Sequence, residues 1–332
     1  MAAAGPGHVE LRVEQSYLEQ LMSSPDVQPD DAPGRTAMAS LRVNLADAVG
    51  FDVPLHLVPD ATLPPATMRV VAGPAWAPLR RLLPLTAIAA QVDPAQVGPE
   101  LTVVGEIDVP WSSRRMALLE DWDASTAPHG ASPIDALTYI AELAFVDGRW
   151  LAPRLVTIQL VAGLCNRLVQ ATTGLAPLVR QRVDIDALTE AMRQLVSERV
   201  PLAPLAPAFQ AALDAEDGDL VRQLRARLPF RLQRTVCYEM FLFRYLVGPG
   251  LHQVLERPPD EALTDLVLQS IAGKIIDPGE GQVSACLSTA PTARDPLRKL
   301  VERRYPGFDV LAHGELPAAV VPIELGDIDV PA

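Results

Sequence analysis

The hydrophobic pattern of this chain changes its period twice, and these changes limit the folds that it can adopt. Near the start, Val9, Leu11 and Val13 alternate with charged residues, which is the period-2 pattern of a half-buried strand. From Pro133 to about residue 213 the apolar residues recur at helical spacing, and the last third mixes both periods. We find no internal repeat. The sequence therefore predicts an α+β protein of several subdomains.

The N-terminal part is predicted to be a small α+β unit. Residues 36–49 carry apolar side chains at helical spacing, and Gly50 supplies the stop expected after a helix. A strand is predicted over residues 51–58, where Pro54 lacks a backbone donor and so favours an edge position. Another strand is expected in TMRVVAG, residues 67–73.

An inserted second subdomain is predicted over residues 73–110, which are punctuated by prolines and end in a strand. The segment Trp111–Trp122 is expected to be a loop. It leads back to the first subdomain, which comprises residues 1–72 and 111–130 in this prediction.

A helical third subdomain is predicted over residues 131–228. Helices are expected over residues 134–145 and 153–173, and a third begins after Asp184, a good N-cap residue. The fourth subdomain, residues 229–332, is predicted to be an α/β unit, because strand and helix patterns alternate there.

Two details of the fourth subdomain can be checked against a structure. Residues 232–247 are predicted to form one or two strands. The end of the chain, from Phe308, is predicted to be strand, turn and strand.

Charge and cysteine content exclude several classes of function. The chain of 332 residues has 28 Lys and Arg against 41 Asp and Glu, a net charge of −13, so neither nucleic acid nor an anionic membrane surface is an expected partner. Cys165, Cys237 and Cys286 lie far apart and form no CxxC pair, which favours a reducing cytoplasm. Without a signal peptide or a long apolar run, the chain is expected to be cytoplasmic and not inserted in a membrane.

No sequence motif for catalysis or cofactor binding is present, and we assign no catalytic, cofactor-binding or metal-binding residue. The five histidines are isolated. An enzyme remains an alternative, with Cys237 activated by His252 or with an anion bound at Asp277–Gly281. Cys237 lies in an apolar run, which favours a buried core position instead.

Tryptophans in polar or Pro-rich segments suggest a binding surface. Trp76, Trp111 and Trp122 all occur in such segments, and aromatic residues are enriched at protein–protein hot spots. The alternative is that each fills a seam between subdomains.

Three segments, in the same order, resemble the cytoplasmic part of the type III secretion and flagellar export-gate family (FHIPEP, FlhA-type proteins). In the first, a helix leads into a VP-containing strand, a loop with a Pro-Pro step and another strand. The residues that carry this likeness are Val49, Gly50, Phe51, Val53, Pro54, Leu63, Pro64 and Pro65.

The second segment is a helix with an LL-x-E-x-V type of ending, and the third is the closing helix with its strand-turn and final strand. In the second, the matching residues are Leu195, Val196, Glu198, Val200, Pro201 and Leu205. In the third, they are Pro306, Phe308, Val310, Leu311, Glu315, Leu316 and Pro317. The resemblance covers about residues 8–330.

This resemblance implies a non-enzymatic module of four subdomains that assembles into a ring of nine and docks chaperone–substrate complexes. It also implies a partner-binding cleft between the first two subdomains, with Trp76, Leu79, Leu82 and Leu85 as apolar anchors. The alternative is that these four side chains only pack the insert. Family members carry a block of membrane helices that this chain lacks, so it is either part of a longer protein or a free-standing scaffold of the same fold.

Overall fold

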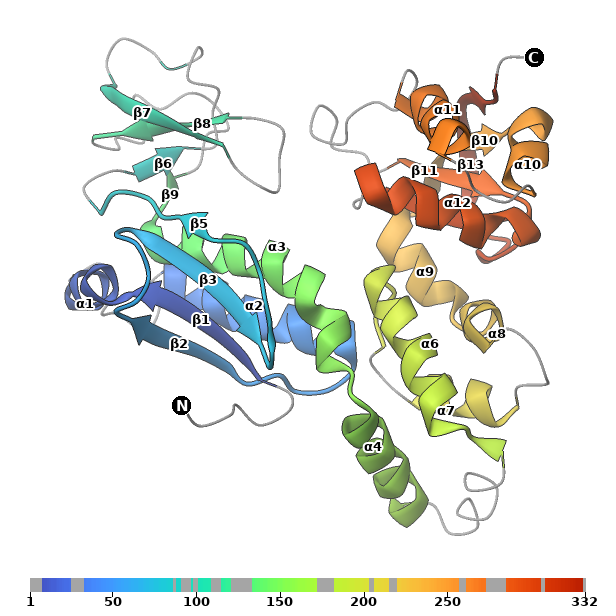
Figure 1. Ribbon diagram of the computed structural model, residues 1–332, viewed down its shortest axis with the longest axis horizontal. Helices are drawn as coiled ribbons and strands as arrows, with labels where there is room; N and C mark the ends of the chain where they lie inside the picture. Colours follow the sequence, from blue (N-terminus) through green and yellow to red (C-terminus); the bar gives the residue numbers. More distant parts are fainter. Residues whose placement is uncertain are drawn as a thin grey trace. The chain divides into compact units, whose positions relative to one another are not determined.

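The computed structural model divides into two compact units, Met1–Val221 and Arg222–Ala332 (Figure 1). The described residues are 8–24, 33–85, 88–90, 97, 101–108, 115–120, 133–171, 182–202, 206–214, 220–256, 261–272, 285–305 and 308–330.

The first unit begins with a five-stranded sheet. Its strands are β1 (Val9–Glu14), β2 (Leu55–Asp60), β3 (Thr67–Ala72), β4 (Ala75–Trp76) and β5 (Arg80–Arg81). The order is β2-β1-β3-β4, and β5 also pairs with β3. β1 runs parallel to β2 and antiparallel to β3, and its Val9, Leu11 and Val13 are buried as the period-2 pattern predicts. β2 lies at the edge, as Pro54 predicts.

Two helices, α2 (Pro33–Val49) and α3 (Ala136–Leu155), pack against each other along their lengths, and α3 also packs on β3 (Figure 1). Glycines allow this close approach. A Cβ atom added to Gly34 would lie 2.5 Å from Leu137 Cβ, and one added to Gly148 would lie 3.2 Å from Leu45 Cδ2. The short helix α1 (Gln15–Ser23) follows β1 directly, and the Glu14 carboxylate caps its N-terminus.

Four antiparallel strands form a second sheet in this unit. They are β6 (Ile88–Ala90), β7 (Val103–Asp108), β8 (Arg115–Leu119) and β9 (Pro133–Ile134), in the order β7-β8-β6-β9. The prediction of a loop over Trp111–Trp122 is wrong at β8, where four consecutive residues, 116–119, are buried. The second sheet also does not coincide with the insert predicted over residues 73–110. Its strands β8 and β9 lie outside that range, whereas β4 and β5, which lie inside it, belong to the first sheet.

The remaining elements described in the first unit are helices, as predicted. Helix α6 (Ile185–Ser197) begins after Asp184, whose carboxylate accepts hydrogen bonds from the backbone of Asp186 and Ala187. Helix α4 (Ile158–Ala171) packs against α6. The helix predicted over residues 153–173 starts later than expected, because α3 continues through Pro153 to Leu155. Helix α7 (Ala206–Leu213) also belongs to this unit.

The second unit is built on a four-stranded sheet in which every pair is parallel. It consists of β10 (Phe241–Val247), β11 (Ala285–Thr289), β12 (Asp309–Ala312) and β13 (Val321–Ile328), in the order β12-β11-β10-β13. The helices of this region are α8 (Leu220–Ala226), α9 (Pro229–Val236), α10 (Pro249–Leu255), α11 (Glu261–Ala272) and α12 (Pro291–Arg304).

One prediction for this region needs correction, and another is confirmed. Residues 232–236 belong to helix α9, and only residues 241–247 form a strand, β10. The strand, turn and strand predicted from Phe308 are confirmed as β12 and β13, which are not neighbours in the sheet because β13 pairs with β10.

The two faces of this sheet are covered differently. Residues of α10, α11 and α12 form an apolar core with Tyr245 and Leu287 on one face. On the other face a smaller cluster joins Val236, Leu242 and Leu311 with side chains of the loop before β13.

A buried ion pair fixes that loop. Arg225 of α8 donates from Nε and Nη2 to the two carboxylate oxygens of Glu315, at 2.7 and 2.8 Å. The backbone N–H of Ala312 donates to the same carboxylate. Burial alone raises the pKa of Glu315, but the hydrogen bonds and charge of Arg225 outweigh it and hold that pKa below its ordinary value.

The contact between α2 and α3 predicts that Gly34→Ala lowers the free energy of unfolding by about 1–3 kcal/mol, because the new methyl group overlaps Leu137. Gly163 in α4 is the matched control, since an added Cβ there meets nothing within 4 Å. Gly163→Ala is expected to raise stability by roughly 0.5–1 kcal/mol. Urea unfolding followed by circular dichroism measures both, and equal destabilisation by the two substitutions would contradict the packing argument.

The Glu315 ion pair predicts an acid-sensitive second unit. Because its folded-state pKa is lowered, its stabilisation is present above about pH 4.3, the ordinary glutamate pKa, and is lost as the pH falls through the folded-state value. Glu315→Gln is expected to cost about 1.5–3 kcal/mol at pH 7 and to lose less on acidification than the parent. Thermal unfolding across pH 3–7 tests this, with the exposed Glu302→Gln as control; parallel pH curves for Glu315→Gln and parent would refute it.

Candidate functional site

The residues predicted to bind a partner lie in one extended segment of the first unit, residues 75–85. Its β4 and β5 both pair antiparallel with β3, Trp76 opposite Val71 and Arg81 opposite Thr67. Between these pairings the Ala77 N–H donates to the Val70 carbonyl at 2.9 Å. The segment is therefore tied along the whole of β3.

The four predicted anchors do not share one environment. Trp76 is 60% exposed, Leu79 is 42% exposed and Leu85 is 37% exposed. Leu82 is only 2% exposed, so its side chain belongs to the core and is not available to a partner. The segment thus exposes the side chains of Trp76, Leu79 and Leu85 to solvent, and the buried Leu82 side chain anchors it to the core.

Backbone and side-chain hydrogen bonds anchor the end of the segment. The Leu82 N–H donates to the Ala66 carbonyl at 2.9 Å, and the Tyr17 hydroxyl donates to the Leu83 carbonyl at 2.7 Å. Burial raises the pKa of the Tyr17 phenol above its usual range, so the hydroxyl keeps the proton that it donates. Leu83 itself is buried beside this bond.

An ion pair joins the middle of the segment to α3. Arg80 donates from Nη2 to Asp147 Oδ1 at 2.6 Å and from Nε to Oδ2 at 3.0 Å, a bidentate arrangement. Asp147 is buried, and Arg80 supplies the positive charge beside its carboxylate. Sequence reasoning missed Asp147, because 67 residues separate it from Arg80 and no local pattern links them.

This arrangement suits a binding surface. Exposed large apolar side chains on a fixed backbone lose little freedom when a partner covers them, and tryptophan is a frequent hot-spot residue. Trp111 and Trp122, the other predicted surface tryptophans, lie outside the described residues. The structure adds Trp150 on α3, 65% exposed, which the helical pattern around it did not reveal.

The residues proposed for nucleophilic catalysis are not brought together. Cys237 packs in the cluster on one face of the β10–β13 sheet. Helix α10, which carries His252, packs on the opposite face. Burial also raises the pKa of the Cys237 thiol, which disfavours the reactive thiolate. The Asp277–Gly281 turn lies outside the described residues.

Other classes of site were searched in the same part of the chain. Within the described ranges, no group of three or more His, Cys, Asp or Glu side chains is arranged to hold a metal ion. Among the helices of those ranges, none has the length and apolar character needed to cross a bilayer.

The ion pair between Arg80 and Asp147 yields a stability prediction. Arg80→Met leaves a buried carboxylate without its partner and is expected to cost about 3–5 kcal/mol. Adding Asp147→Leu removes that carboxylate, so the double variant is expected to be more stable than Arg80→Met alone. Urea denaturation of the single and double variants measures the difference; a double variant less stable than the single one would rule out an unpaired charge as the cause.

No protein-family model and no curated protein sequence matches the chain. Solved structures share its fold. The CdsV protein of Chlamydia pneumoniae has a TM-score of 0.82 at 17% identity, over 98% of this chain and 99% of that chain. A Chlamydia pneumoniae CdsV and CdsO complex gives 0.80 at 16%, over 98% and 99%. The nonameric EscV cytosolic domain from the type III secretion system gives 0.65 at 13%, over 98% and 97%. The chain therefore has the fold of the cytoplasmic domains of type III secretion export-gate proteins, the family that its sequence motifs resemble.

Proposed function

We propose that this chain is a non-enzymatic protein-docking module of a type III secretion or flagellar export apparatus. It acts in the cytoplasm, and its partners are export chaperones with their substrates. The docking surface consists of Trp76, Leu79 and Leu85.

One observation carries this proposal: three large apolar side chains project from a backbone that is fixed on both sides. Pairing with β3 holds one side of the segment, and the Arg80–Asp147 ion pair holds it to α3. A surface prepared in this way binds without first ordering a flexible loop, and this lowers the entropic cost of association.

The kind of partner follows from the fold and from charge. CdsV is known in complex with another protein, CdsO, and EscV assembles as a nonamer. We extend both properties to this chain as part of the proposal: it binds proteins, and nine copies form a ring. The net charge of −13 argues against nucleic acid as the ligand.

Trp76→Ala tests the proposal. It is expected to weaken binding of a purified chaperone–substrate complex from the same bacterium by about 30-fold, the effect of losing a hot-spot tryptophan worth about 2 kcal/mol. Because Trp76 is exposed, the fold and the melting temperature are expected to stay unchanged. Isothermal titration calorimetry measures the affinity.

Tyr238→Ala is the matched control, since Tyr238 is an aromatic residue with the same exposed fraction of 60% in the second unit. It is expected to bind as the parent does. Equal affinities for Trp76→Ala and the parent would remove Trp76 from the site. A pull-down that recovers a defined set of proteins without any export component would instead favour a scaffold of this fold in another system.

A further inference from the structure

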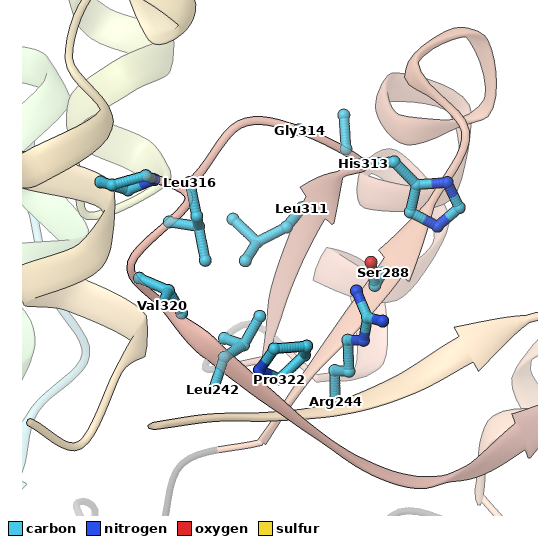
Figure 2. Close-up of a pocket in the computed structure, with 11 residues that line it drawn as sticks. Leu242, Arg244, Ser288, Leu311, His313, Gly314, Leu316, Val320 and Pro322 are labelled. Carbon is cyan, nitrogen blue, oxygen red and sulfur yellow. The ribbon is translucent and has the colours of Figure 1, made fainter. Parts of the chain in front are cut away.

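A pocket of about 140 Å³ opens on one face of the β10–β13 sheet, the face that α10, α11 and α12 leave uncovered (Figure 2). Leu242 of β10 and Leu311 of β12 form its floor, and Leu316 and Val320 of the loop before β13 form a wall. These four side chains make most of the pocket apolar.

The opposite end of the pocket is polar. Arg244, Ser288 and His313 line it together, with the Arg244 guanidinium directed toward the other two side chains (Figure 2). His313 and the adjacent Gly314 are exposed, so this end meets solvent at the rim. All three polar side chains offer hydrogen-bond donors, and arginine offers nothing else.

One buried donor at this end of the pocket, Arg244 Nε, is unused. Arg244 Nη2 donates to Glu324 Oε1 at 2.9 Å, but its Nε is buried without an acceptor in the described part of the chain. Ser288, which lines the same end of the pocket, is only 3% exposed. Buried donors without partners are costly, so a ligand that accepts from them gains that free energy on binding.

The pocket is held open by its surroundings. The loop that forms its wall contains Glu315, which the ion pair with Arg225 fixes in place. The Val320 N–H donates to the Pro317 carbonyl at 3.0 Å, which adds a turn at the other end of the same loop. A ligand therefore enters a preformed cavity.

Size limits what can enter. An engineered apolar cavity of about 150 Å³ in another protein accommodates benzene, whereas sites for drug-sized ligands are about 300–1,000 Å³. The pocket thus admits one group the size of an amino-acid side chain. We propose that it binds a small apolar carboxylate, with the apolar part against Leu242, Leu311 and Val320 and the carboxylate at Arg244 and Ser288. This site is separate from the docking surface and does not depend on the proposed docking function.

A matched pair of probes tests the chemistry. The full chain is titrated with 4-methylpentanoate and with its neutral amide, and binding is followed by ligand-observed NMR. The acid is expected to bind at least about tenfold more tightly than the amide, because only the acid makes a charge-assisted bond to Arg244. Equal binding of both probes, or no binding of the acid up to its solubility limit, would overturn the proposal.

Three variants locate the site. Arg244→Gln is expected to weaken acid binding about tenfold, and Ser288→Ala about fivefold, without changing the weak binding of the amide. Glu324→Gln removes the carboxylate that competes for Arg244, so it is expected to bind the acid at least as tightly as the parent. Thermal melting checks that each variant folds. Parent-like acid binding by both Arg244→Gln and Ser288→Ala would contradict the assignment.

The same chemistry has two sources, a free organic acid and the C-terminal residue of a polypeptide. The peptide Gly-Gly-Leu with a free carboxylate, compared with its C-terminal amide, separates them. Binding of the peptide acid as tight as that of 4-methylpentanoate assigns the site to a chain terminus. Binding of 4-methylpentanoate alone assigns it to a small metabolite.

Discussion

The bidentate ion pair between Arg80 and Asp147 connects the first sheet of the first unit, through β5, to helix α3. It joins a strand of two residues to a helix of twenty, and the carboxylate lies buried at the junction. A strand this short has too few ladder bonds to hold its position alone. The ion pair and the buried Leu82 beside it supply the missing restraint, and the exposure of Trp76 and Leu79 depends on it.

Those parts of the fold that rest on local patterns could be predicted from the sequence. β1 alternates buried and half-buried residues, and α6 begins after its Asp184 cap. β8 could not be predicted, because residues 116–119 are buried on both faces and so show no alternation. Residues 232–247 are predicted to form one or two strands, but residues 232–236 belong to α9, and so short a segment shows no period that separates helix from strand.

The candidate site could be predicted only as a stretch of chain. The spacing of Leu79, Leu82 and Leu85 by three residues gave no means of telling which side chain is buried. Only the pairing with β3 decides that Leu82 points inward, and this pairing depends on residues distant from the segment. The partner of Arg80 likewise comes from packing of α3, which no short-range pattern encodes.

The position of β13 in the sheet has a consequence for the order of folding. Its pairing with β10 joins residues about 80 apart, as between Arg244 and Glu324, whereas β11 and β12 are linked by a single helix. Closing the longer loop has a larger entropic cost, and contacts of high sequence separation form slowly. We therefore expect β10, β11 and β12 with their helices to assemble before β13 pairs with β10. On this expectation the pocket wall next to β13 forms late, and the pocket can bind a ligand only after β13 has paired.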